Sequence, residues 1–240
     1  MSLSQDQFPR RELRWPDSCR LVPSRFPPVL LFDAVVDPAD LAVVFAIEAL
    51  GNPRLRDEIG ELALVPDDQR ISGPGSSPIM AAFTHLNPEG SRFSDGSYGV
   101  YYAAADLATA VAEVSHHRAR FLARTQEPAI DIDLRCYRVT VAAVLCDLRG
   151  LREEASAEAL YHPDSYAASQ IFGSQLRLAT EPEAGIAYDS VRWPGGQCVA
   201  LFTPRATQPP ARQAEHVSLR WNGDRISEWY LKSDHHVVSS

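Results

Sequence analysis

Residues 91–122 read SRFSDGSYGVYYAAADLATAVAEVSHHRARFL. The first nine residues are polar and contain two glycines, so this part is expected to be a loop. Residues 99–103 are apolar and aromatic, which favours a strand. Asp106 is a suitable N-cap for a helix that runs from Leu107 to about Leu122. The sequence therefore predicts a loop, a strand and a helix in direct succession.

The predicted helix carries a polar stripe beside its apolar face. At about 100° per residue, the apolar face is formed by Leu107, Ala110, Val111, Val114, Phe121 and Leu122. Glu113 lies on the adjoining stripe, with Thr109 one turn before it and His117 one turn after it. A carboxylate in that position can project into a cleft beside the sheet. The alternative is an ordinary surface glutamate that pairs with His117.

The chain before this run mixes polar, proline-rich and apolar segments. Residues 1–18 are polar and are expected to form a flexible lead-in, whereas 21–35 are expected to be strand or extended chain. Asp37 precedes a proline and should start a helix. Residues 67–77 contain a Gly-Pro-Gly turn signal and should form a loop. Residues 79–85 are short and apolar, and either a helix or a strand is compatible with them.

The chain after this run is richer in strand signals. The predicted strands cover residues 137–148, 186–191 and 198–202, followed by a hairpin at 216–232 around Asn222-Gly223. Residues 151–180 are expected to be a helical insert in two pieces, because His162-Pro163-Asp164 interrupts them. Helices and strands do not follow a βαβ rhythm. We therefore expect an α+β fold with a mixed or antiparallel sheet and helical additions, in a single domain over 19–240.

Composition excludes several classes of protein. The net charge of −8 argues against nucleic acid as a direct partner. Lys232 is the only lysine, so anions would be bound by arginine guanidinium groups. The four cysteines show no zinc spacing and are expected to be free structural thiols. No signal-peptide core and no membrane-length apolar run is present, which favours a soluble cytoplasmic protein.

The loop, strand and helix together suggest a chemistry. This succession would bring Arg92, a tyrosine of the strand and Glu113 towards one another. A guanidinium fork can hold phosphate or ribose oxygens, and an aromatic ring can stack on a planar base. A carboxylate can stabilise a positively charged, sugar-like transition state. These are the groups that a dinucleotide such as NAD requires.

The same residues carry a family resemblance. The run from Arg92 to Leu122, followed by GIAYDSVRWPGGQCVALF at 185–202, resembles the RES domain family. That family is named for a spaced arginine, glutamate and serine, which Arg92, Glu113 and Ser190 match. Tyr102 matches a tyrosine that family members carry between the first two. The segments VPSRFPP, NPRLR and IMAAFTH are similar to its longer subgroup, so the resemblance extends from Cys19 to Phe202.

The resemblance implies a fold and an activity. RES proteins are toxins of bacterial toxin–antitoxin pairs, and their fold resembles that of ADP-ribosyltransferases. The antitoxin usually has a helix-turn-helix part. Members consume NAD as a substrate by breaking the nicotinamide–ribose bond, or transfer ADP-ribose to a protein. No prosthetic group is implied.

The implied reaction assigns a role to each matching residue. Glu113 would hydrogen-bond the ribose and stabilise the oxocarbenium ion, by analogy with glycoside hydrolysis. Arg92 would hold the ribose or a phosphate, and Tyr102 would pack on the nicotinamide. Ser190 would bind the nicotinamide ribose or fix Glu113. Tyr101 competes with Tyr102, because strand alternation directs only one of them into the cleft.

Other residues are weaker candidates for function. Arg20 and Arg192 are possible phosphate ligands, and Ser190 could instead cap a backbone turn. His116 and His117 point to different helix faces and do not form a metal motif. Cys198 sits in an apolar strand, which favours a buried structural thiol over a nucleophile.

The expected function is that of a toxin which cleaves NAD and passes ADP-ribose to phosphate or water. Its expected partners are NAD and a cognate antitoxin, with no nucleic acid, membrane or metal. One alternative is an ADP-ribosyltransferase that modifies a host protein. Another is a non-catalytic module that binds a nucleotide or a protein. In the catalytic case, Arg92 and its neighbours should form a positive pocket in this acidic chain.

Overall fold

One continuous sheet organises the chain. The computed structural model describes residues 7–25, 31–35, 37–45 and 60–233. Within them, seven strands form a sheet of order β1-β2-β5-β4-β3-β6-β7. The strands are β1 (Arg10–Pro23), β2 (Tyr101–Ala104), β3 (Ile130–Asp147), β4 (Gly185–Asp189), β5 (Gln197–Leu201), β6 (Thr207–Trp221) and β7 (Ile226–Leu231).

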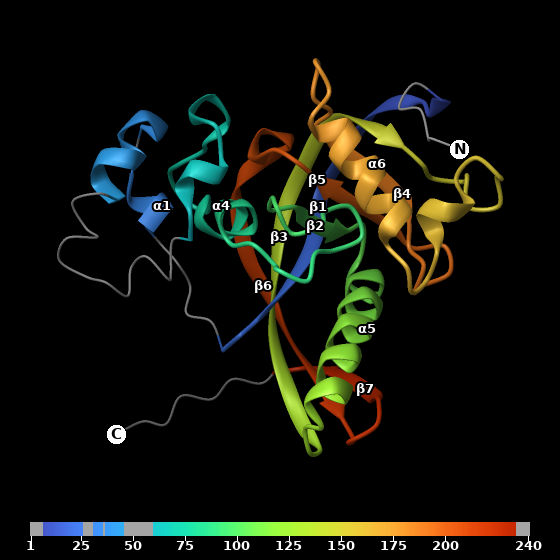
Figure 1. The fold of residues 1–240 in the computed structure, drawn as a ribbon. Coiled ribbons are helices and arrows are strands. Elements are labelled where there is room, and N and C mark those ends of the chain that lie inside the picture. Colours follow the sequence, from blue (N-terminus) through green and yellow to red (C-terminus); the bar gives the residue numbers. More distant parts are fainter. Residues whose placement is uncertain (1–6, 26–30, 36, 46–59, 234–240) are drawn as a thin grey trace, which may run out of the picture.

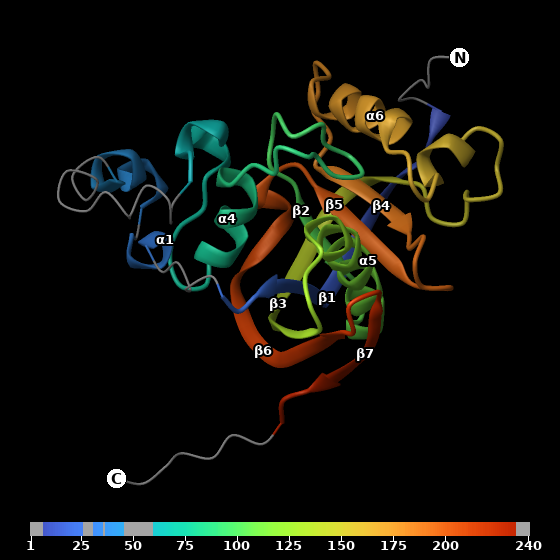
Figure 2. The same cartoon turned by 60° about the horizontal axis from the view of Figure 1, so that its bottom comes forward.

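The sheet closes on itself through β1. This strand pairs along most of its length with β3 and also meets β2 at the pair Cys19 and Ala104. Strands β1, β2, β5, β4 and β3 therefore form a ring, and the β6–β7 hairpin extends from β3 (Figure 2). The pair β3–β4 is parallel and the other pairs are antiparallel. The expected α+β fold with a mixed sheet is confirmed.

Helices pack against both faces of the sheet (Figure 1). The α-helices that lie wholly within the described residues are α1 (Leu31–Ala34), α4 (Ser77–Thr84), α5 (Leu107–Thr125) and α6 (Ala167–Arg177). One apolar cluster joins α5 and α6 to the sheet through residues such as Val111 and Phe172. A second cluster joins α1 and α4 to the other face, through Phe32 and Met80 among others. No helix of the described residues is long and apolar enough to cross a membrane.

The prediction of a flexible lead-in is wrong for residues 10–18. They form the first part of β1 and pair with residues 139–146 of β3. The local sequence pattern does not predict this strand, because the side chains of Arg11, Glu12 and Arg14 are charged and exposed, and Leu13 between them is buried. Its stability comes from a partner more than 120 residues away, which no local pattern encodes. Residues 1–6 lie outside the described part.

The other local predictions agree with the structure to different degrees. Residues 21–35 were expected to be strand or extended chain. Strand β1 covers this segment as far as Pro23, whereas Leu31–Ala34 form helix α1, and residues 26–30 lie outside the described part. Asp37 caps a helical start, since its Oδ1 accepts a hydrogen bond from Ala39 N at 2.9 Å. Residues 79–85 belong mainly to helix α4.

The insert at 151–180 is helical in two pieces, as predicted. A 3-10 helix (Glu158–Tyr161) and α6 flank the break at His162-Pro163-Asp164. The strand predicted at 137–148 starts earlier, at Ile130. In the hairpin, β6 likewise begins before the predicted residue 216.

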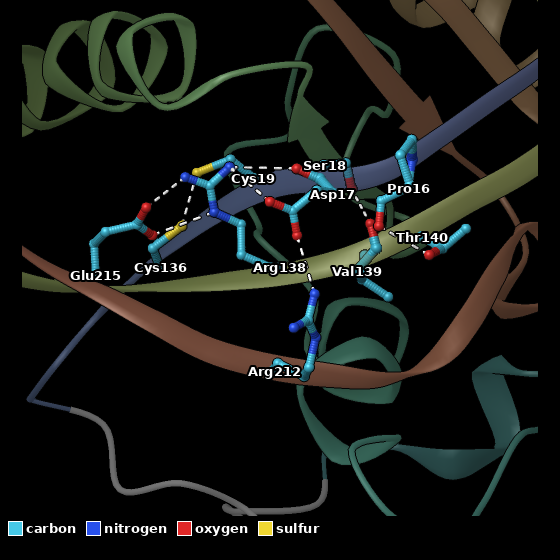
Figure 3. Close-up of polar contacts among 10 residues, drawn as sticks. All are labelled: Pro16, Asp17, Ser18, Cys19, Cys136, Arg138, Val139, Thr140, Arg212 and Glu215. Atoms are coloured by element: carbon cyan, nitrogen blue, oxygen red, sulfur yellow. Dashed lines mark hydrogen bonds and ion pairs between the residues drawn. The ribbon is translucent and has the colours of Figure 1, made fainter.

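A polar cluster ties β1, β3 and β6 together where β1 is irregular (Figure 3). Arg138 of β3 donates from Nη2 and Nε to the two carboxylate oxygens of Glu215 on β6, at 2.7 and 3.2 Å. Its Nη1 also reaches Asp17 O of β1 at 3.3 Å. Next to this cluster, the free thiols of Cys19 and Cys136 lie 2.8 Å apart. These contacts hold β1 in place directly before Cys19, Arg20 and Leu21, which line the cavity described below.

Candidate active site

A cavity of about 1090 Å³ opens between α5, the sheet and the loop 86–92. The insert contributes to its wall through Asp164, Tyr166 and Gln170. Its arginines are Arg20, Arg25, Arg92, Arg118, Arg120 and Arg124, against the carboxylates of Glu89, Glu113 and Asp164. The cleft thus carries a positive excess in a chain of net charge −8, as expected for a site that receives an anion.

Glu113 and Ser190 meet at the wall of this cavity. Ser190 Oγ donates a hydrogen bond to Glu113 Oε1 at 2.6 Å, although 77 residues separate them in sequence. The same Oγ accepts from the backbone N–H groups of Arg192 and Trp193, at 3.1 and 3.0 Å. The Ser190 hydroxyl therefore both caps its own turn and orients the carboxylate of Glu113. Oε2 of Glu113 accepts no hydrogen bond from the described residues, so this atom is available to a ligand.

Gly196 explains why Ser190 can approach α5 so closely. A Cβ atom at Gly196 would lie 2.5 Å from Thr109 Oγ1 and 2.7 Å from Thr109 Cγ2. Thr109 stands one helical turn before Glu113 on the same stripe. Gly196 O also accepts from Ser190 N at 2.8 Å. The missing side chain lets the 190–196 turn rest on the start of α5, which positions Ser190 beside Glu113.

Arg92 is buried in the cavity wall, with 5% of its surface exposed. Its Nη1 donates to the carbonyl oxygens of Leu160 and His162, at 3.0 and 3.1 Å. The ring of Tyr166 covers the guanidinium, with Arg92 Cζ 4.7 Å from the ring centroid. Arg92 Nη2 has no hydrogen-bond partner among the described residues. A buried unsatisfied donor of this kind is a candidate ligand-binding atom.

Tyr102, rather than Tyr101, faces the cavity. Tyr101 points to the opposite side of the sheet, where it stacks on Phe83. The Tyr102 hydroxyl accepts from Phe93 N at 2.9 Å and bonds Ser91 Oγ at 2.9 Å. Burial raises the pKa of Tyr102, so it stays a neutral phenol. Its hydroxyl thus holds the loop that carries Arg92.

The insert builds much of the Arg92 environment, which the sequence reasoning missed. Besides the carbonyl acceptors and Tyr166, Gln170 Nε2 donates to Ser91 O at 3.1 Å. Gly173 of α6 lies so close that a Cβ there would be 2.3 Å from Phe93 O. The sequence predicted the two helical pieces and the break at 162–164, but no short motif in the insert indicates contacts to Arg92.

The remaining candidates take less direct positions. Burial first, then the charge of Arg192, lowers the pKa of His116 to about 4. His117 lines the cavity and is exposed. The described residues contain no group of three or more side chains suited to a metal. Cys198 is buried, and burial raises its pKa well above the usual value, as suits a structural thiol.

The two weaker arginine candidates differ in location. Arg20 lines the cavity and donates from Nη1 to Tyr102 O at 3.1 Å. Arg192 follows Ser190 but does not line the cavity, and its Nη2 donates to Pro163 O. Arg192 thus links the 190–196 turn to the insert. Phe121, predicted on the apolar face of α5, is instead 41% exposed and lines the cavity.

Comparisons with known proteins cover the part of the chain that contains these residues. The model of the RES domain matches residues 68–222, a range that contains Arg92, Tyr102, Glu113 and Ser190. The uncharacterized protein y4oC of Sinorhizobium fredii (strain NBRC 101917 / NGR234) is 33% identical over 215 residues, covering 90% of this chain and 87% of that protein. A chain from the MbcT-MbcA toxin-antitoxin complex of M.tuberculosis aligns with a TM-score of 0.47 and 12% identity, covering 91% of this chain and 90% of that chain.

The family match spans more than half of the chain and includes both halves of the site. The relative from S. fredii extends the similarity over nearly the whole length. The chain belongs to the RES domain family.

Proposed function

We propose that this protein is the toxin of a toxin–antitoxin pair and cleaves the nicotinamide–ribose bond of NAD. The observation that carries the proposal is the Ser190–Glu113 hydrogen bond of 2.6 Å, which orients a carboxylate at the wall of an arginine-rich cavity. Membership of the RES family supports the toxin role, because that role is what the family resemblance implies.

In this reaction, the C–N bond breaks and its electron pair returns to the nicotinamide ring, which leaves as a neutral molecule. Positive charge then develops on the ribose. Glu113 stabilises this charge with Oε2 while Ser190 holds Oε1. Phosphate or water adds to the ribose carbon and releases a proton, giving ADP-ribose 1-phosphate or ADP-ribose.

Arg92 and Tyr102 complete the proposed site. Arg92 Nη2, which has no partner among the described residues, donates to a ribose or phosphate oxygen of the substrate. Tyr102 borders the same cavity and packs on the nicotinamide ring. The Arg92 side chain is held by two backbone carbonyls, so little conformational entropy is lost when it binds.

The test is to follow NAD consumption by the purified protein, with and without phosphate, and to identify the products by mass. Glu113→Gln should lower kcat by roughly 10²- to 10³-fold without a change in melting temperature. Glu127→Gln, at an exposed position just after α5, removes the same charge and should leave the rate unchanged. No NAD loss with the wild type, or full activity in Glu113→Gln, would refute the proposal.

Two further assays address the acceptor and the toxin role. Labelled NAD in a cell lysate would place label on a protein band if a protein were the acceptor, whereas we expect label in small molecules only. Induced expression of the wild type should arrest growth, and Glu113→Gln should not. Growth arrest by the Glu113→Gln variant would separate toxicity from NAD cleavage.

A further inference from the structure

Strand β7 is the last strand of the sheet and has one open edge. Within the described residues it pairs with β6 alone, and it lies beside α5 (Figure 1). Three consecutive large side chains of β7 are exposed: Trp229 by 42%, Tyr230 by 36% and Leu231 by 46%. The match to the RES domain ends at residue 222, before this strand. An open edge that carries exposed apolar side chains is a template for a further strand.

The pairing with β6 determines which backbone groups of β7 point to this edge. Lys232 N donates to His216 O of β6 at 2.8 Å. Along an antiparallel ladder, residues whose backbone groups bond to the neighbouring strand alternate with residues whose groups point away from it. Tyr230, two residues before Lys232 in the same register, therefore bonds to β6. The N–H and C=O groups of Trp229 and Leu231 point to the open edge.

The side chains of β7 alternate between the two faces of the sheet. Trp229 and Leu231 lie on the same face as α5, opposite buried residues of β6. Glu228, Tyr230 and Lys232 lie on the other face. Glu228 and Lys232 each form an ion pair within the chain, but their side chains remain 57% and 44% exposed. Both charged groups can therefore take a second partner beyond the edge.

We propose that β7 pairs with β7 of a second copy of this chain, in antiparallel orientation and with the two-fold axis at Tyr230. In this register, Trp229 faces Leu231 of the second copy, and their open backbone groups form hydrogen-bonded pairs. Glu228 faces Lys232 of the second copy, so opposite charges meet on both sides of the axis. The two Tyr230 side chains meet at the axis as an aromatic cross-strand pair.

The complementarity of β7 to itself is what assigns the edge to a second copy. An axis at Glu228 would place two glutamates opposite each other, and an axis at Trp229 would leave Glu228 and Lys232 without opposite charges. Exposed ion pairs contribute little stability, so they select the register, while the apolar pairs and the backbone bonds supply the affinity. One edge strand is a small interface, so the dimer should form in the micromolar range. Strand β7 contributes no residue to the cavity, so dimerisation and NAD cleavage can be tested separately.

Sedimentation equilibrium over roughly 1–300 μM protein tests the association. The wild type should pass from 26.5 kDa towards twice that mass as its concentration rises. Trp229→Lys places a cation opposite Leu231 of the second copy and should raise the dissociation constant at least about tenfold. Trp193→Lys changes a similarly exposed tryptophan (46%) outside the sheet and should dimerise like the wild type. A wild type that stays monomeric, or a dimer that a folded Trp229→Lys variant retains, would overturn the proposal.

Cysteine substitutions test the register. Tyr230→Cys places two thiols opposite each other at a non-hydrogen-bonded pair, where the side chains are close enough for a disulfide. Treated with oxidised glutathione, this variant should become a covalent dimer. Glu228→Cys, which faces Lys232 of the second copy, should stay monomeric on the same gel. The four native cysteines are buried and do not compete. Equal cross-linking of the two variants would exclude an axis at Tyr230.

Charge-reversed variants test the role of the ion pairs. Glu228→Lys and Lys232→Glu should each dimerise more weakly than the wild type, because like charges then face each other across the axis. Mixed in equal amounts, the two variants should form a heterodimer in which each new charge meets its opposite. A mixture that stays monomeric would contradict this register. If the wild type is monomeric alone and Trp229→Lys abolishes binding of another protein, the edge serves that protein and the assignment to a second copy is wrong.

Discussion

Gly196→Ala is the substitution that most directly tests how the two halves of the site are joined. The new Cβ would lie 2.5 Å from Thr109 Oγ1, whereas ordinary contact begins at 3.4 Å. The 190–196 turn must therefore recede from α5 by about 0.9 Å unless Thr109 moves. A displacement of that size would stretch the Ser190–Glu113 hydrogen bond from 2.6 Å to about 3.5 Å, where it is effectively broken.

Both stability and activity should respond to this substitution. Overpacking of this kind costs about 1–3 kcal/mol, which corresponds to about 2–4 °C in melting temperature for each kcal/mol. Loss of a charge-assisted hydrogen bond to Glu113 is worth about 1.5–3 kcal/mol. If that bond orients Glu113 in the transition state, kcat for NAD cleavage should fall by roughly 10- to 100-fold.

The assay is a double-mutant cycle with Thr109→Ala, which removes the two atoms nearest to the new Cβ. In that background, Gly196→Ala should cost much less stability and activity. Gly195→Ala is the control, because a Cβ there meets nothing within 4 Å and adds only backbone strain at φ +76. Wild-type melting temperature and kcat in Gly196→Ala would refute the reasoning. So would an undiminished loss in the Thr109→Ala background.

Three further predictions concern other contacts. Tyr102→Phe leaves the amide of Phe93 without its acceptor and should cost about 1–3 kcal/mol; an unchanged melting temperature would contradict this. Gly173→Ala would place a Cβ 2.3 Å from Phe93 O and should lower both the melting temperature and the rate of NAD cleavage. A variant with the wild-type melting temperature and rate would show that α6 can move away from Phe93 without loss. A hydrogen bond from Arg138 lowers the pKa of Glu215 in the folded protein (Figure 3). The stabilisation by this ion pair is therefore fully present above about pH 4.3, the pKa of a glutamate in the unfolded chain, and it is lost as the pH falls through the pKa of Glu215 in the folded protein. Urea titrations should show Glu215→Gln less stable at pH 7 by about 1 kcal/mol, with the difference shrinking towards pH 3; a constant difference would exclude the ion pair as its cause.

The helix that carries Glu113 was predictable because its signals are local. Asp106 caps it through a hydrogen bond from Thr109 N at 2.8 Å, and Ala110, Val111 and Leu122 are buried as the periodicity predicts. Phe121 was assigned to the core by the same periodicity, which was wrong. Phe121 faces the cavity, and periodicity cannot distinguish a cavity wall from a core contact.

The contacts that assemble the site are less accessible to sequence reasoning. Ser190 was linked to Glu113 only through the family resemblance, since nothing local pairs two residues 77 positions apart. The carbonyl groups that hold Arg92 are backbone atoms of the insert, and any residue type can supply them. Strand β1 was missed for a related reason, because its pairing energy comes from β3 and its exposed side chains are charged.

The division of the site between early and late parts of the chain has a consequence for synthesis on the ribosome. Arg92 and Glu113 are translated before their partners at residues 160–166 and 190 exist. A growing chain that ends at α5 therefore has neither the acceptors that orient its arginine nor the hydroxyl that orients its carboxylate. Under the proposed function, NAD cleavage can therefore begin only after the turn at Ser190 has left the exit tunnel.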